Sequence, residues 1–197
     1  MFIEVPHALL TAALSIFLFL ALCAALVLVV VSLRRPTTLP LAISGGLVVA
    51  STLLVAVAPV DVPAVMGLIL ALLGVCLAVL GGNPITRRVL DLATGGRVRE
   101  TADGGILLPA AHRAGESDEL EPLLRGGTTI GYLERLAVVV AIIAGYPEAI
   151  AVVVAIKGIG RFSELAAAEA RERFIIGTIG SLLWACVVGA LVRLAIW

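Results

Sequence analysis

The chain has 197 residues, of which 61% are hydrophobic and only 14% are charged, and its formal net charge is zero. A soluble domain is about 45–50% apolar and about 25% charged, so this composition excludes an ordinary soluble protein. The absence of a basic stripe also argues against a nucleic-acid-binding protein. The apolar residues form blocks of about twenty, the length that crosses a hydrocarbon core of about 30 Å. The sequence therefore predicts an all-α, polytopic transmembrane helical bundle.

Residues 1–83 are interpreted as an N-terminal unit of three membrane spans. The spans cover about residues 8–33, 39–57 and 64–80. The first apolar run has no basic residue before it and is too long for a signal peptide, which favours a retained span. The second contains Ser44 beside Gly45-Gly46, small residues that allow another helix to approach. The third is expected to end at Gly81-Gly82-Asn83-Pro84.

Residues 84–129 form the only long hydrophilic segment and are predicted to be a cytoplasmic loop. They contain six arginines and seven acidic residues, so neither sign of charge dominates. A polybasic lipid anchor is therefore not indicated. Polar and apolar residues alternate around Asp103-Gly104, which predicts a small β-hairpin within the loop.

Residues 130–197 are interpreted as a C-terminal unit, a helical hairpin followed by a last span. In the hairpin, 130–162, two apolar runs are separated by Gly145-Tyr146-Pro147-Glu148. Each arm of about 13–15 residues reaches only about 20–23 Å. The sequence leaves open whether this hairpin fully spans the membrane, thinning it locally, or is re-entrant.

Four charged residues form a candidate polar cluster at the base of the hairpin. They are Glu134, Arg135, Lys157 and Arg161. Folding the hairpin at Tyr146-Pro147 brings Glu134 level with a point between Lys157 and Arg161. The favoured interpretation is a structural ion pair that closes the hairpin. The alternatives are a polar entrance for an ion, lipid headgroup or substrate, and a docking site for a partner.

Glu148 is a second candidate. It is a simple helix-start carboxylate if the hairpin tip reaches the outer face. If the hairpin is re-entrant, it becomes an intramembrane carboxylate, and ionisable groups inside a membrane are candidates for function.

The last span, about 175–195, carries small residues at four-residue spacing. They are Gly177, Ser181, Ala185 and Gly189. This spacing puts them on one helix face, which predicts a packing surface for a helix of this chain or of another copy. The polar stretch 162–174 before it is expected to be a cytosolic helical extension.

The distribution of basic residues predicts the orientation. With a hairpin at 130–160 there are six membrane segments, and all 14 basic residues except Arg193 fall on one side. With a single long span there are five, and the basic residues divide between the sides. Because positively charged loops stay in the cytoplasm, the first arrangement is favoured. It places both termini outside and the loop 84–129 inside, in a bacterial inner membrane.

One part of the chain resembles a known group. The matching residues are Ile130-Gly131, Leu133-Glu134-Arg135, Glu148-Ala149-Ile150, Ala155-Ile156-Lys157, Ile159, Arg161-Phe162, Ile176-Gly177-Thr178 and Ser181. Over 130–181 the chain resembles an uncharacterised family of bacterial polytopic integral membrane proteins. Gly158, Gly160 and Arg173-Phe174 depart from its pattern. The resemblance implies that the hairpin is a module. It implies no particular activity for this chain.

Function is left as three hypotheses. The chain has none of the common catalytic or nucleotide-binding motifs, no cysteine or histidine pattern for a metal, and no sign of a cofactor. The first hypothesis is a non-enzymatic subunit or scaffold that contacts lipids and binds another membrane protein or a second copy of itself. The second is a small transporter or channel that uses the charges of the broken hairpin. The third is a lipid-modifying membrane enzyme.

Overall fold

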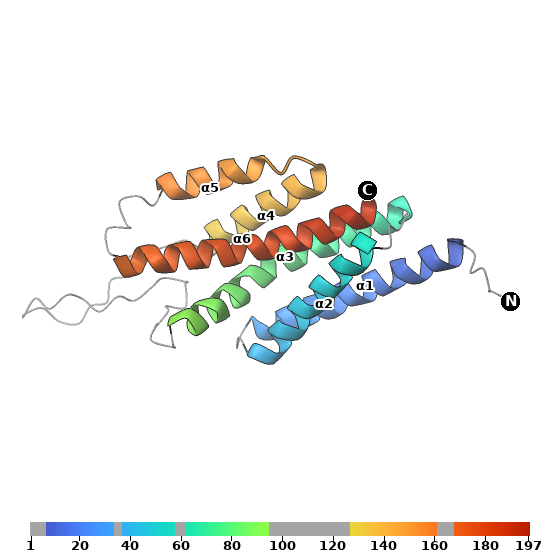
Figure 1. Cartoon of the computed structure of the whole chain (residues 1–197), viewed down its shortest axis with the longest axis horizontal. Helices are drawn as coiled ribbons and strands as arrows, with labels where there is room; N and C mark the ends of the chain where they lie inside the picture. The colour runs from blue at the N-terminus through green and yellow to red at the C-terminus, as the bar shows by residue number, and fades with distance from the viewer. Residues whose placement is uncertain (1–6, 34–36, 58–61, 95–126, 161–167) are drawn as a thin grey trace, which may run out of the picture.

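The computed structural model describes residues 7–33, 37–57, 62–94, 127–160 and 168–197, which form helices and no strand. The helices are α1 (His7–Ser32), α2 (Thr38–Val57), α3 (Ala64–Thr94), α4 (Gly127–Ala144), α5 (Ala149–Gly160) and α6 (Ala168–Ile196). All except α5 are long and apolar enough to cross a membrane. Successive helices run in opposite directions along one bundle, and this alternation holds for all six helices (Figure 1). The predicted all-α membrane bundle is confirmed.

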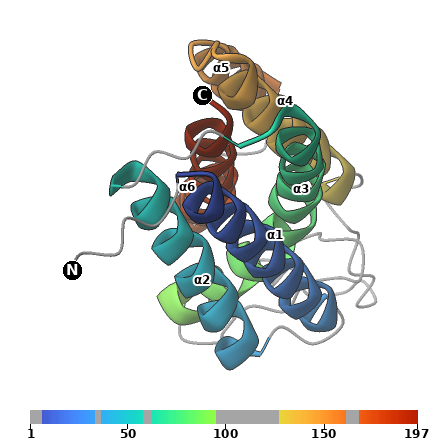
Figure 2. The same ribbon diagram turned by 90° about the vertical axis from the view of Figure 1, so that its right-hand side faces the viewer.

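Helix α6 lies at the centre of the bundle. It packs mainly against α3 and α4 and also contacts α2, whereas α1 packs on α2 and α3. Seen from one end, α1 and α2 lie on one side and α5 at the opposite margin, outside α4 (Figure 2). Leu18, Leu77 and Val188 are almost completely buried, yet Leu20, Leu53 and Leu72 are largely exposed. An apolar exterior around an apolar core is the surface that a bilayer requires.

The small residues of α2 have unequal roles. Ser44 Oγ donates a hydrogen bond to the backbone carbonyl of Ala25, at 3.2 Å, and so joins α2 to α1. A Cβ added to Gly45 or Gly46 would meet no atom within 4 Å. The expected close approach of a helix therefore occurs at Ser44 and not at the two glycines.

Helix α3 continues where the sequence predicts its end. It runs unbroken from Ala64 to Thr94 with Pro84 inside it, so the expected termination at Gly81–Pro84 is wrong. Proline removes one N–H from the helix interior and normally kinks or ends it. In the two turns before Pro84, Arg135 of α4 donates a hydrogen bond to Val79 O and Trp184 of α6 donates one to Leu77 O. The helix also crosses the expected boundary between residues 83 and 84.

The break after α4 forms the predicted hairpin turn. Gly145 has a φ of +84°. Its N–H donates to Ile142 O at 3.1 Å, and the N–H of Tyr146 donates to Ala141 O at 2.8 Å. This pair of bonds is the Schellman arrangement that terminates helices, and glycine adopts the required φ most easily. The alternative of one long span across 130–160 is therefore wrong.

Arg193 holds this turn from the neighbouring helix. Its Nη1 lies 3.3 Å from the carbonyl oxygens of both Ile142 and Ile143, in the last turn of α4. A cation at a helix C-terminus interacts favourably with the helix dipole. This contact gives a structural role to Arg193, the one basic residue that the predicted topology places on the side opposite the others.

The hairpin turn does not reach the end of α6. A Cβ added to Gly189 would lie 3.2 Å from Ile142 Cβ, so these two positions are level. Gly189 precedes Ile196 by about 10 Å of helix, whereas Ile142 precedes Gly145 by only about 5 Å. The turn therefore lies about 5 Å inside the end of α6.

Candidate functional site: a buried arginine and an ion pair

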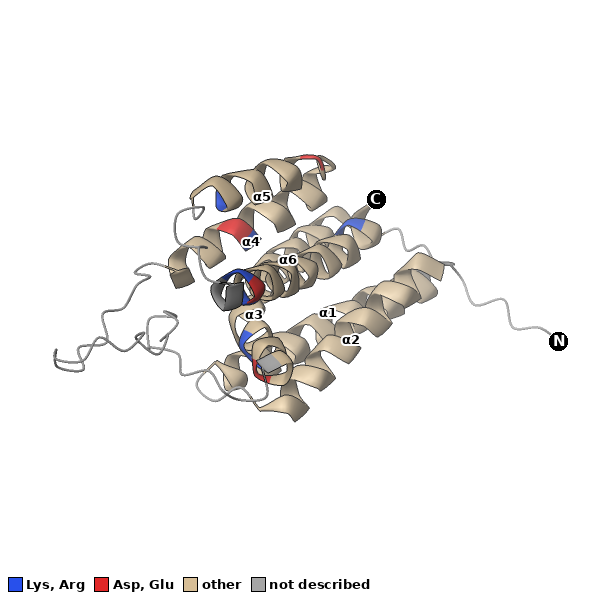
Figure 3. Cartoon of the chain, turned by 60° about the vertical axis from the view of Figure 1, so that its left-hand side comes forward, with Lys and Arg blue, Asp and Glu red and all other residues tan. Residues whose placement is uncertain are grey.

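The charged residues of the described chain lie mainly at the ends of the bundle, with an inner group on α4 (Figure 3). Arg87 and Arg88 follow the start of α3 by about 35 Å, and Arg173 precedes the end of α6 by about 35 Å. These lengths exceed a hydrocarbon core of about 30 Å. A Cβ added to Gly177 would lie 3.6 Å from Leu90 Cδ1, so both charged ends lie at the same end of the bundle.

Among the residues that the structure describes, Arg135 is the most buried charged side chain, with 2% of its surface exposed. Its Nε donates to Val79 O at 2.9 Å, its Nη2 to Asn83 Oδ1 at 2.8 Å, and its Nη1 to Ser181 Oγ at 2.8 Å. The guanidinium also lies 5.3 Å from the ring centre of Tyr132. The planar fork of arginine suits several fixed acceptors at once. One side chain thus joins α4 to α3 and α6.

Two adjacent glycines make room for this network. A Cβ added to Gly82 would lie 2.2 Å from Arg135 Cδ, and one added to Gly81 would lie 2.5 Å from Trp184 Nε1. Trp184 Nε1 donates to Leu77 O at 3.1 Å. The Gly81-Gly82 pair therefore lets an arginine and a tryptophan reach the backbone of α3. This role is not predicted from the sequence, where its only signal is an arginine directly before the apolar run that starts at Leu136.

Glu134 and Lys157 form an ion pair between the two arms of the hairpin. Lys157 Nζ contacts Glu134 Oε2, and the side chains are 15% and 9% exposed. Lys157 Nζ also lies 5.7 Å from the ring centre of Phe174 on α6. Adjacent residues on a helix point in directions about 100° apart. The expected cluster is thus divided, with Glu134 facing α5 and Arg135 facing α3 and α6. Arg161 lies outside the described residues, as does the expected β-hairpin around Asp103.

Glu148 is exposed at the hairpin turn, directly before α5. Its backbone carbonyl accepts a bond from the N–H of Ala151 at 3.1 Å. The side chain takes part in neither the arginine network nor the ion pair.

The four small residues of α6 are covered by helices of the same chain. A Cβ added to Gly177 would contact Thr86 and Leu90 of α3, and one added to Gly189 would contact Ile142 of α4. Ser181 accepts a hydrogen bond from Arg135. Ala185 is completely buried in the core. This packing face therefore serves the fold of the chain itself.

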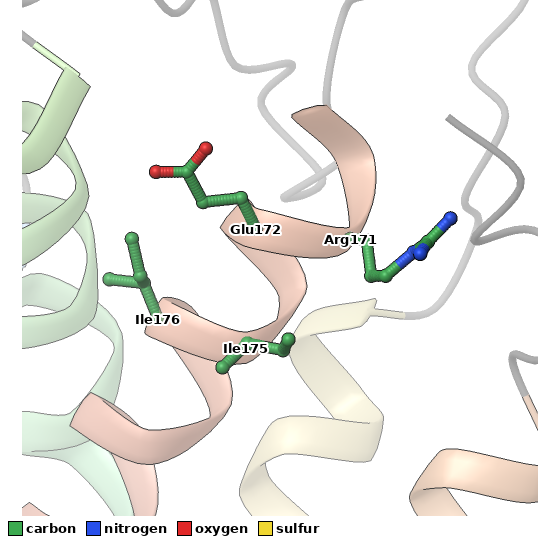
Figure 4. A pocket seen from close by; sticks show the side chains of 4 residues that line it. All are labelled: Arg171, Glu172, Ile175 and Ile176. Atoms are coloured by element: carbon green, nitrogen blue, oxygen red, sulfur yellow. The ribbon is translucent and has the colours of Figure 1, made fainter. Parts of the chain in front are cut away.

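An open pocket of about 290 Å³ lies at the start of α6, lined by Arg171, Glu172, Ile175 and Ile176. Glu172 and Ile176 extend to one side of the helix, and Arg171 and Ile175 extend to the other (Figure 4). The polar groups do not converge on one point. Within the described ranges, no group of three His, Cys, Asp or Glu residues could hold a metal ion.

Comparison with protein-family models, with curated proteins and with solved structures finds no match. The resemblance over 130–181 therefore stays a prediction.

The ion pair leads to a stability prediction. Glu134→Gln should strand the ammonium of Lys157 in a mostly buried place and destabilise the fold by about 2–3 kcal/mol, below the full cost of about 3–5 kcal/mol for a completely buried pair. The double variant Glu134→Gln/Lys157→Met should recover part of this loss. Thermal unfolding in detergent of both single variants and the double variant measures the coupling. Losses that simply add in the double variant would show that the two charges do not interact.

Proposed function

We propose that this chain is a non-enzymatic integral membrane protein that binds another membrane protein through the α4–α5 hairpin. The observation that supports this proposal is the exposure of α5, because none of its residues is buried. Its main neighbour is α4. At 12 residues it is about 18 Å long, too short for a hydrocarbon core of about 30 Å.

The two sides of the bundle differ in apolar height, and this difference supports a partner at the hairpin. On α1, exposed apolar residues extend from Leu9 to Val31, about 33 Å along the helix. On α5 the large exposed hydrophobic residues extend only from Val152 to Ile159, about 10 Å. A short apolar surface is accommodated by thinning the bilayer or by oligomerising. A partner helix along α5 would supply the missing length.

The proposed orientation follows the predicted topology in a bacterial inner membrane. The charged ends of α3 and α6 face the cytoplasm, and the hairpin enters from that side as a re-entrant element whose turn stops short of the outer face. The excess of basic residues at this end supports the assignment. The position of the turn, about 5 Å inside the end of α6, supports the re-entrant form.

Cysteine labelling tests this orientation. In a chain whose three native cysteines are replaced by alanine, Ser117→Cys should react with a membrane-impermeant thiol reagent only after the cells are opened. Trp197→Cys, at the exposed C-terminal end, should react in intact cells. The reverse pattern would require the opposite orientation.

Photo-crosslinking tests the proposed partner contact. A photoreactive residue at Ile156, which is 67% exposed on α5, should yield one defined protein adduct in native membranes. The matched control is Leu20, which is 59% exposed on α1 and should react with lipid only. The same adduct pattern from both positions, or lipid adducts alone from Ile156, would contradict a partner site on the hairpin.

A small transporter is the second candidate, and the charge of Arg135 favours it. The hydrogen-bond acceptors of this buried cation are neutral groups, and ionisable residues inside membranes often mark transport pathways. Against this, each of the three guanidinium nitrogens already donates a hydrogen bond to a fixed group of α3 or α6. Ion flux into proteoliposomes that contain only the purified chain separates the candidates, because a scaffold alone should not exceed the leak of empty vesicles.

A further inference from the structure

Three side chains attach α5 to the rest of the bundle. Ile150 and Val153 are half-buried against the core, and Lys157 forms the ion pair. Their spacing of three and then four residues puts them on one face of the helix. The opposite side is apolar and exposed, and Ile159 near the far end is 79% exposed.

These three attachments differ in strength. Within a bilayer, leaving a protein neighbour for lipid costs an isoleucine or valine little, because lipid tails are equally apolar. Lys157 is different, because its ammonium is mostly buried and would lose its anionic partner if α5 moved away from α4. It contacts Glu134 of α4 and the ring of Phe174 on α6. We call the set of Lys157, Glu134 and Phe174 the Lys157 latch.

The other end of α5 resembles a hinge. The cap of α4 is fixed by the bonds of Gly145 and Tyr146 and by Arg193. The start of α5 has only local backbone bonds, from Ala149 to Tyr146 O at 3.1 Å and from Ile150 to Pro147 O at 3.0 Å. The segment 145–148 is therefore anchored to the bundle where it leaves α4. Where it enters α5, it is held only by backbone bonds of the first turn of α5.

We propose that α5 is a movable arm, that the Lys157 latch fixes its resting position, and that opening the latch presents Glu134 and the inward face of α5 to the partner. The last clause rests on the proposed function. The movement itself does not, because both the latch and the hinge lie within this chain. Breaking one ion pair is enough to shift the arm, since no other polar side chain of α5 contacts the bundle in the described residues.

Distance measurement by electron spin resonance tests the arm without any partner. Spin labels at Ile159→Cys on α5 and Leu92→Cys on α3, in a chain without native cysteines, should give one narrow distance distribution in lipid nanodiscs. Glu134→Gln should raise the ratio of open to latched molecules by about tenfold or more. The charge exchange Glu134→Lys/Lys157→Glu should restore the narrow distribution. The matched control is Glu148→Gln, which removes a hairpin carboxylate outside the latch and should change nothing.

A second label pair, at Leu20 on α1 and Leu183 on α6, reports whether the bundle itself is intact. If the Leu20–Leu183 distance changes in Glu134→Gln, the Ile159–Leu92 distance is measured instead in Lys157→Met, which leaves no stranded cation. A narrow Ile159–Leu92 distribution in Lys157→Met, or a charge exchange that fails to restore it, would overturn the latch. Failure of Ile156 to crosslink a partner would contradict the proposed function and leave these distances unaffected.

Discussion

Replacing Arg135 with leucine is expected to destabilise the bundle by about 3 kcal/mol, a large part of the stability of a domain of this size. The substitution removes the donors to Val79 O, Asn83 Oδ1 and Ser181 Oγ. A buried polar group without a partner costs about 1–3 kcal/mol. Removing the buried charge itself offsets part of that sum. Arg135→Lys should be only a partial rescue, because a single ammonium cannot reproduce the planar fork.

Thermal unfolding in detergent measures this loss, and the chain offers a matched control. Arg173 is a half-buried arginine of α6 that takes no part in the network, and its leucine variant should lose less than about 1 kcal/mol. Equal stability of the Arg135→Leu and Arg173→Leu variants would show that the network does not hold the three helices together.

Gly82→Ala is expected to cost about 2–3 kcal/mol through overpacking. The new Cβ would lie 2.2 Å from Cδ and 2.4 Å from Nε of Arg135. These atoms belong to the middle of a side chain held by three hydrogen bonds, so they cannot move aside without losing bonds. By contrast, Gly46→Ala on α2 meets open space and should be neutral or stabilising by up to about 1 kcal/mol, because alanine favours helix.

A double-variant cycle gives this prediction its sharpest form. If the added methyl group of Gly82→Ala conflicts only with Arg135, the substitution should cost little in a chain that already carries Arg135→Leu. Unfolding temperatures of the four proteins in one detergent measure the coupling. An equal cost of Gly82→Ala in both backgrounds would place the conflict elsewhere.

Local patterns were sufficient to predict the hairpin. The turn at Gly145 and Pro147 follows from residue types that end and begin helices. The approach of Glu134 to Lys157 follows from counting equal lengths along two antiparallel arms. Both inferences use only neighbouring residues, so they need no knowledge of how distant helices pack.

The course of α3 and the neighbours of Arg135 depend on contacts between distant segments. Pro84 predicts a helix end by its local chemistry, whereas α3 continues to Thr94 and packs against α4 and α6. The same limit applies to α6, whose small-residue face could accept any helix. The spacing from Gly177 to Gly189 defines a face but cannot say which helix covers it.

The arginine network also has a consequence for how the protein is made. Arg135 obtains its acceptor Ser181 from a helix that begins more than thirty residues later, and the two side chains are 46 positions apart. A ribosome adds about 5–20 residues per second. For some seconds, the arginine must therefore sit in a newly inserted α4 without Ser181, and of its acceptors only Val79 and Asn83 of α3 can offset the cost of its charge inside the membrane. We expect α4 to stay beside the insertion machinery until α6 emerges, so that α4 and α6 enter the bilayer together.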